Sequence, residues 1–225
     1  MDSRQHFNAI AQQYDFWKEK NAYYHTALKK LLSAHIPEGK RVLEIGCGTG
    51  SLLASLKPSA GLGIDISEAM VASAQKKYGQ RPELTFKTVD IRSLTEGLPY
   101  EYIFLADVLE HVADLPEFLT KLRSLALLDA EIIVTLANPI WEPLLMLSEK
   151  LHLKMPEGPH WRLSIKSMEK LFHETGFAII QRGYDLLVPK PLPGANFANK
   201  YLAQLPGLKK LDFIVYWKIR VDKKV

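Results

Sequence analysis

Val42-Leu43-Glu44-Ile45-Gly46-Cys47-Gly48-Thr49-Gly50 joins a short apolar run to three closely spaced glycines. Its apolar first half predicts a buried strand, and the closely spaced glycines predict a tight turn directly after it. Glycine is favoured in such a turn because a side chain would keep the backbone away from a ligand. A second short apolar run ends at Asp65, within Gly63-Ile64-Asp65-Ile66-Ser67. In doubly wound folds an acidic residue at this place hydrogen-bonds ribose hydroxyls, so the two stretches together predict a nucleoside site.

The spacing of the glycines separates the candidate cofactors. A dinucleotide-binding turn needs its third glycine at the position occupied here by Ser51. Glu44, just ahead of the turn, suits a cation better than a pyrophosphate. The pattern E-x-G-x-G-x-G resembles the first motif of class I S-adenosylmethionine-dependent methyltransferases, whose cofactor carries an ammonium and a sulfonium group and no phosphate. A nicotinamide-dependent dehydrogenase and a glycine-rich turn without a ligand are the alternatives.

The composition suits one globular domain. The chain has 225 residues, 47% of them hydrophobic and 24% charged, without low complexity or internal repeats. We expect a single domain over residues 1–225, comprising a helical lead-in (1–40), a cofactor-binding core (41–138), and cap elements with the last helix and strands (139–225). Cys47 is the only cysteine, which excludes an intramolecular disulfide and favours a reducing, cytoplasmic setting.

Positive charge is concentrated toward the C-terminus. The formal net charge is +4, but residues 186–225 contain eight Lys or Arg against two Asp. A solvated surface is the simplest interpretation, and contact with an anionic surface is the alternative. We expect no nucleic-acid partner, because the cluster is short and lacks a recognisable binding motif. We also expect neither a secretory signal nor a membrane span.

Strand-like and helix-like segments alternate from Arg41 onward, which predicts a parallel sheet with right-handed crossovers. The expected strands are 41–45, 61–64, 84–89, 102–105, 132–136, 177–185 and 211–219. Helices are expected from about residue 50, and over 67–78, 115–125 and 164–175, with Ser67 as an N-cap. A Pro- and Gly-rich insert around 187–206 separates the last two strands, which could pair as a hairpin-like edge.

The resemblance to class I methyltransferases covers residues 41–138 and extends more weakly to the last strand. It implies an α/β, Rossmann-like fold: a mostly parallel seven-stranded sheet flanked by helices, with an antiparallel last strand and helical cap elements. It also implies S-adenosylmethionine as cofactor and S-adenosylhomocysteine as product. Ala-Asp-Val-Leu-Glu-His-Val (106–112) resembles the segment that lines the cofactor cleft in small-molecule methyltransferases, including ubiquinone-biosynthetic O-methyltransferases.

The resemblance also implies roles for individual residues. Glu44 and the glycine turn would hold the methionine portion, Asp65 the ribose, and Asp90 the adenine amino group. Both aspartates could instead cap helices or turns, and Tyr14, in an A-x-x-Y-D element, could close over the cofactor or simply pack. The implied cofactor-binding residues are Tyr14, Glu44, Gly46, Cys47, Gly48, Thr49, Gly50, Asp65, Ile66, Met70, Asp90, Ile91, Ala106, Asp107 and Val108.

Two histidines are candidates for catalysis. Transfer to a hydroxyl benefits from a general base, and His111 and His160 are the residues considered, His111 first because its segment would line the cofactor cleft. By resemblance to ubiquinone-biosynthetic enzymes, Asp107, Glu110 and His111 could instead bind a divalent metal. Adjacent residues on a helix point apart, however, and no metal is assigned.

The caps suggest the kind of methyl acceptor. Apolar residues at Trp141, Leu144, Leu145, Met146, Trp161 and 197–205 favour a small hydrophobic or aromatic molecule, although a packed cap helix would look the same. The L-E-H-V segment favours O-methylation over N- or C-methylation. A non-catalytic cofactor-binding module is the alternative from another class. The apolar inserts with the basic C-terminal region also predict peripheral membrane contact to collect a lipophilic acceptor. The oligomeric state is not predicted.

Overall fold

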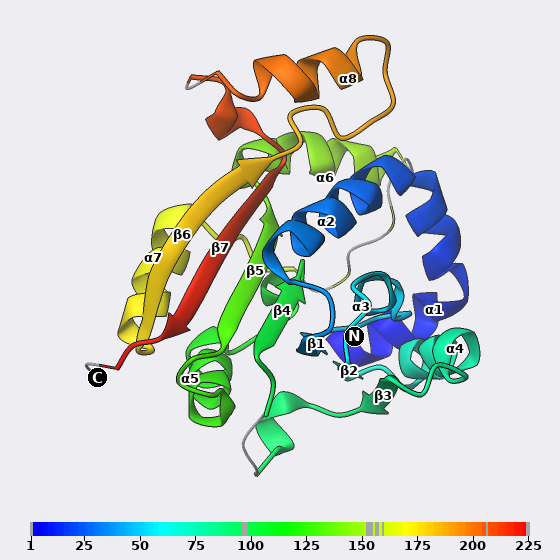
Figure 1. Ribbon diagram of the computed structural model, residues 1–225. Coiled ribbons are helices and arrows are strands. Elements are labelled where there is room, and N and C mark those ends of the chain that lie inside the picture. Colours follow the sequence, from blue (N-terminus) through cyan, green and yellow to red (C-terminus); the bar gives the residue numbers. More distant parts are fainter. Residues whose placement is uncertain are drawn as a thin grey trace.

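The protein is built on one sheet with helices on both faces (Figure 1), as seen in a computed structural model that describes residues 2–95, 99–151, 155, 158, 160–205 and 207–223. The strands are β1 (Arg41–Ile45), β2 (Ala60–Asp65), β3 (Leu84–Thr88), β4 (Tyr102–Ala106), β5 (Glu131–Ala137), β6 (Phe177–Asp185) and β7 (Ile214–Val221). Their order is β3-β2-β1-β4-β5-β7-β6. Strands β1 to β5 run parallel, whereas β7 is antiparallel to both β5 and β6. The expected sheet with an antiparallel last strand is confirmed.

The helices follow the expected alternation. They are α1 (Ser3–Lys20), α2 (Ala22–His35), α3 (Ser51–Ser55), α4 (Glu68–Tyr78), α5 (Leu115–Leu125), α6 (Glu142–Lys150), α7 (Ile165–Glu174) and α8 (Ala195–Phe197). Ser67 caps α4, as predicted, because its side chain accepts a hydrogen bond from the Met70 N–H. None of the described helices is long and apolar enough to cross a membrane.

Side chains of the central strands alternate between two cores. Leu43 and Ile45 of β1 pack in a cluster that includes apolar residues of α5 and α7, whereas Val42 packs with those of α2, α3 and α4. Ile132 and Ile133 of β5 likewise belong to different clusters, and both are fully buried. This double burial explains the continuous apolar runs in the sequence.

The C-terminal third differs most from expectation. Strand β7 begins at Ile214 instead of residue 211, because Lys209–Leu211 form a 3-10 turn before it. Helix α6 lies in the segment between β5 and α7; residues 152–154, 156–157 and 159 of that segment lie outside the described part. Asn138 Nδ2 donates to the Lys210 carbonyl over 3.0 Å, which joins the start of this cap to the insert before β7.

Candidate active site

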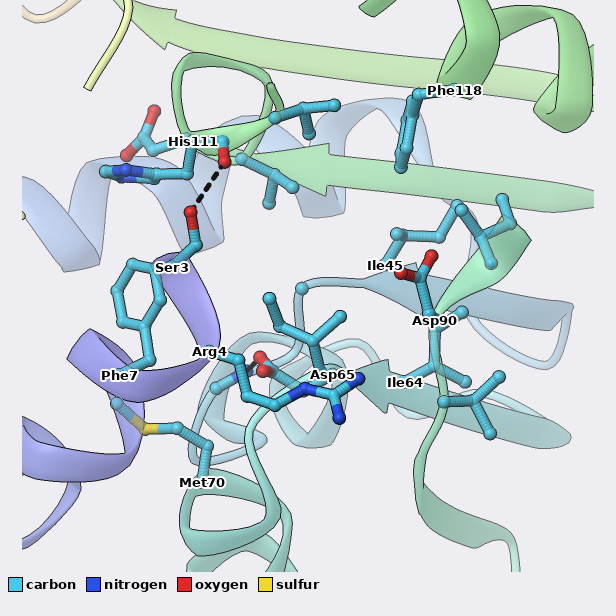
Figure 2. A pocket seen from close by; sticks show the side chains of 18 of the residues that line it. Ser3, Arg4, Phe7, Ile45, Ile64, Asp65, Met70, Asp90, His111 and Phe118 are labelled. Carbon is cyan, nitrogen blue, oxygen red and sulfur yellow. Dashed lines mark hydrogen bonds between the residues drawn. The ribbon is translucent and has the colours of Figure 1, made fainter. Parts of the chain in front are cut away.

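A cavity of about 410 Å³ lies at the carboxyl ends of β1, β2 and β4 (Figure 2). Strands β1 and β4 are neighbours in the sheet, although two other strands separate them in the sequence. This is the point where the strand order reverses, and ligands of open α/β sheets bind outside the carboxyl ends there. The predicted residues that line the cavity are Tyr14, Gly46, Gly48, Asp65, Ile66, Met70, Asp90, Ile91, Ala106, Asp107, Val108 and His111.

The glycine turn lines this cavity with backbone atoms at Gly46 and Gly48. Gly46 and Gly48 have φ angles of +75° and +50°, which side chains disfavour. A Cβ atom at Gly46 would lie 2.5 Å from Val108 Cγ2, and one at Gly48 would lie 3.2 Å from Tyr14 Cε1. The backbone conformation therefore favours glycine at both positions, and at Gly46 a Cβ atom would also clash with Val108.

Asp65 joins this turn to the start of α4. Its Oδ2 accepts from the Gly48 N–H, and its Oδ1 accepts from the Ser67 N–H, each over 2.8 Å. Burial raises the pKa of the Asp65 carboxyl, while the two N–H groups act in the opposite direction. The carboxylate thus organises the turn and also faces the cavity, so its capping and ligand-binding interpretations are compatible.

Asp107 follows β4 in a left-handed conformation with a φ of +55°. The Tyr24 hydroxyl donates to its Oδ2 over 2.5 Å, and the Thr135 hydroxyl donates to its Oδ1 over 3.2 Å. Burial, followed by the nearby Asp107 charge, raises the Tyr24 pKa well above its ordinary value, so this phenol remains a donor. Side chains from α2 and β5 therefore fix the carboxylate in the cavity wall.

Asp90 stands at the far end of the cavity, after β3. It accepts from the Arg92 N–H and guanidinium, and the guanidinium bonds lower the Asp90 pKa. Asp90 therefore caps the 3-10 turn Ile91–Ser93, as its structural interpretation suggested, while also lining the cavity. Figure 2 shows the Arg4 side chain extending from α1 into the space near Asp65.

Four predicted cofactor residues do not line the cavity and instead support the turn. Glu44 is buried, and its Oε2 accepts from the Leu53 N–H of α3 over 3.2 Å. Burial raises the Glu44 pKa to about 8, against the attraction of Lys18. Burial likewise raises the pKa of the Cys47 thiol, Thr49 Oγ1 donates to Asp15, and Gly50 is packed against Phe86.

The two histidines lie next to each other, and only His111 reaches the cavity. His111 lines the cavity, and the edge of the Phe7 ring contacts it with centroids 5.1 Å apart. His160 does not line the cavity; its ring centroid lies 5.8 Å from that of His111, and its Nε2 lies 3.6 Å from Glu142 Oε2. Among the described residues, no group of three or more His, Cys, Asp or Glu side chains is arranged to hold a metal ion.

The sequence prediction omitted the first turns of α1 from the site, along with Arg92 and several apolar residues that also line the cavity. Asp2, Ser3, Arg4 and Phe7 line the cavity together with Tyr14, and Ser3 Oγ donates to the His111 carbonyl over 2.9 Å (Figure 2). The capping box from Asp2 to Gln5 could have located the start of this helix. No local sequence pattern predicted that this helix would lie across the carboxyl ends of the strands.

The residues expected to form an acceptor pocket lie elsewhere. Trp141, Leu144, Leu145, Met146 and Trp161 do not line the cavity, nor do the described residues of the 197–205 insert. Several of them are largely exposed, among them Leu144, Trp161 and Phe197. They belong to the surface of the cap elements outside the cavity.

Comparison with known proteins finds one family over most of the chain. A family model described as a methyltransferase domain matches residues 16–182. The magnesium-protoporphyrin O-methyltransferase of Synechocystis sp. is 38% identical over 109 residues, which is 44% of this chain and 45% of that protein. A ubiquinone biosynthesis O-methyltransferase of Rhodopseudomonas palustris is 26% identical over 162 residues, or 68% and 64% of the two chains. The chain therefore spans less than two thirds of the length of these relatives.

A solved structure shows the same fold. The crystal structure of magnesium protoporphyrin IX methyltransferase from Synechocystis PCC 6803 with bound SAH has a TM-score of 0.65 and 20% sequence identity to this chain. The match covers 97% of both chains. The architecture is thus shared nearly from end to end.

Proposed function

We propose, because this chain belongs to the methyltransferase domain family, that it transfers a methyl group from S-adenosylmethionine to an oxygen atom of a small hydrophobic molecule. The donor is the cofactor present as SAM or SAH in related solved structures. The preference for oxygen is supported by two relatives named as O-methyltransferases and by the histidine in the cavity wall. N- or C-methylation and non-catalytic binding are the alternatives.

The assignment of S-adenosylmethionine as methyl donor rests on one observation. The cavity is lined by carboxylates and lies beside a glycine turn where neighbouring side chains leave little room for a Cβ atom. Asp65, Asp90 and Asp107 all face this space. Carboxylates suit the ammonium, sulfonium and ribose hydroxyls of S-adenosylmethionine and disfavour a pyrophosphate, although Arg4 and Arg92 also line the cavity and Arg92 pairs with Asp90. The residues present therefore fit this cofactor, with Gly46 and Gly48 beside its methionine portion, Asp65 at its ribose and Asp90 toward its adenine.

S-adenosylmethionine, when bound, supplies a methyl group already activated by its sulfonium sulfur. What remains for the protein is to align the acceptor with that methyl group and to exclude water. Phe7 and Tyr14 of α1 line the cavity opposite the strand ends and would shield it from solvent. The Asp107 carboxylate, held by Tyr24 and Thr135, would fix the wall on the acceptor side.

His111 is the proposed base for a hydroxyl acceptor. Its ring is in the cavity wall, and a neutral imidazole can accept a hydroxyl proton near neutral pH. Phe7 and His160 contact two sides of this ring. Glu142 beside His160 would act as a positioning residue, since its carboxylate favours one orientation of that second imidazole. His160 is thus proposed to support His111 from outside the cavity.

Methyl transfer can be tested directly. Purified protein is incubated with S-adenosylmethionine labelled at its methyl group and a panel of lipophilic phenols, carboxylic acids and amines, and product is extracted. We expect label in hydroxylated compounds, with His111→Ala lowering kcat by about 10²- to 10⁴-fold and leaving SAH affinity nearly unchanged. His173→Ala, on the exposed side of α7, is the matched control. Label only in amines, with His111→Ala fully active, would contradict O-methylation; bound cofactor without any transfer would favour the binding module.

The remaining expectations stay predictions. They include one domain over residues 1–225, a cytoplasmic location and the absence of a nucleic-acid partner. Peripheral membrane contact likewise stays a prediction.

A further inference from the structure

Helix α6 turns an apolar stripe toward solvent. Leu144, Leu147 and Leu151 recur at intervals of three and four residues, which places them on one side of the helix and its C-terminal end. Their exposed fractions are 51%, 52% and 58%, and α6 contains no buried residue. A surface helix of a globular protein normally buries such a stripe. Within the part of the chain that the structure describes, the stripe therefore lacks the packing partner that its pattern implies.

The insert between β6 and β7 presents a second exposed group. Its large apolar residues at the surface are Leu192, Phe197, Tyr201, Leu205 and Leu211. The same insert, residues 186–211, contains four lysines and no aspartate or glutamate. Lys190, Lys200, Lys209 and Lys210 are exposed, and none of them forms an ion pair with another described residue. Aromatic and aliphatic side chains interleaved with exposed lysines are typical of a membrane-surface segment.

These two groups lie at one end of the molecule. Trp141 Nε1, at the base of α6, donates to the Leu211 carbonyl over 2.8 Å, and Asn138 binds the Lys210 carbonyl. Figure 1 shows α6 and α8 together beyond the same end of β5. That end is the carboxyl edge of the parallel strands, where the cavity also lies. We define the stripe on α6 and the exposed apolar and lysine residues of 186–211 as the cap surface.

We propose that the cap surface binds an anionic lipid membrane. The leucines, Phe197 and Tyr201 would enter the boundary between headgroups and acyl chains, while the lysines would contact lipid phosphates. Charge complementarity favours this occupant, because the insert contains four lysines and no acidic residue, while Asp185 and Asp212 stand only at its two ends. The proposal rests on the proposed function in one respect, that a lipophilic acceptor would reach the adjacent cavity from the membrane.

Vesicle co-sedimentation of the full chain tests this surface. The probes are vesicles of phosphatidylcholine alone and vesicles that also contain about one third phosphatidylglycerol, at low salt and at high salt. We expect binding to the anionic vesicles only, weakened strongly by salt. Leu144→Asp with Leu147→Asp, and separately Lys200→Glu with Lys210→Glu, should each reduce the partition coefficient at least about tenfold.

Matched controls separate the surface from general effects. Leu127→Asp with Leu128→Asp changes two exposed leucines that directly precede β5. They lie at the amino ends of the parallel strands, opposite the cap surface. Lys76→Glu with Lys166→Glu gives the same change in net charge on α4 and α7. Both control pairs should change the partition coefficient less than about twofold, because neither pair lies near the cap surface.

Three results would overturn the proposal: no binding of the wild type to anionic vesicles, equal losses in the control variants, or self-association through α6 without vesicle binding. SAH affinity, measured on every variant, reports whether the cavity is intact. Loss of vesicle binding with SAH affinity retained concerns the cap surface alone, whereas a wild type that binds vesicles but not SAH would reject the proposed function and leave the lipid surface standing.

Discussion

Asp65 connects the glycine turn to the nucleoside end of the cavity, so its replacement should affect binding twice. Asp65→Ala removes a carboxylate that faces the cofactor and also frees the N–H groups of Gly48 and Ser67. Charge-assisted hydrogen bonds contribute about 1.5–3 kcal/mol, so the SAH dissociation constant should rise roughly 10- to 100-fold in a calorimetric titration. Asp114→Ala, which removes the N-cap of α5 outside the cavity, is the control. Equal affinities for wild type and Asp65→Ala would reject the ribose role.

Gly46 allows a comparison of two glycines with the same backbone conformation. Gly46 and Gly39 both have a φ of +75°, but a Cβ at Gly46 would meet Val108, whereas nothing lies within 4 Å of one at Gly39. Both changes to alanine carry left-handed strain of about 1–2 kcal/mol. Only Gly46→Ala should lose further stability in urea unfolding and weaken SAH binding. Indistinguishable variants would contradict the close approach assigned to the turn.

Glu44 should make stability depend on pH. Burial holds its pKa at about 8 in the folded protein, against an ordinary value of 4.5. Between these values the folded protein keeps a proton that the unfolded chain has lost, so the free energy of unfolding falls as pH rises. Glu44→Gln removes this contribution and should gain stability relative to wild type across that window, measured as urea midpoints. Glu38→Gln, at an exposed carboxyl, is the control. Parallel profiles for Glu44→Gln and wild type would be inconsistent with the burial effect.

The glycine turn could be predicted from individual residues in the sequence, but the direction in which each neighbouring side chain points could not. Gly46 and Asp65 could be predicted from their spacing in the sequence alone. Glu44 belongs to the same motif, yet its carboxylate binds the α3 backbone beneath the turn. Neighbouring strand residues face opposite sides of a sheet, and the sequence does not state how the following helix closes over them.

At the scale of elements, α1 is the piece that completes the cavity. Its Asn8 side chain accepts from Ser67 Oγ over 2.7 Å and from the Ala69 N–H over 3.2 Å, which ties α1 to the start of α4. Asn8→Ala should therefore speed amide hydrogen exchange in α1 and weaken SAH binding several-fold, although Asn8 does not line the cavity.

Asn199→Ala is the matched change for this test, because it removes comparable bonds to Val188 and Tyr23 away from the cavity. It should leave SAH affinity and exchange in α1 unchanged. Slower or equal exchange in Asn8→Ala would mean that other contacts hold the helix in place.

Most strands and helices could be predicted from the sequence. Each central strand is buried on both faces and therefore has a continuous apolar run. The boundaries of β7 were not, because Leu211 looks apolar enough to extend the strand but lies in a 3-10 turn. The position of α1 across the sheet edge depends on contacts such as Asn8 with Ser67, which join residues far apart in the chain. Local patterns carry no information about such pairs.

For the whole molecule, alternation of strands and helices was sufficient to predict the parallel sheet, and the reversal between β1 and β4 explains where the cavity forms. The caps were harder to interpret. Leucines such as Leu144 and Leu147 give the same helical pattern whether they face a core, an acceptor or a lipid surface, and only their exposure in the folded chain separates these cases.

A calorimetric titration of the wild-type protein with SAH and with NAD shows whether the cavity is a methyl-donor site. The acid-lined cavity beside Gly46 and Gly48 should bind SAH and give no detectable heat with NAD, whose pyrophosphate the carboxylates would repel. Tighter binding of NAD than of SAH would contradict the account.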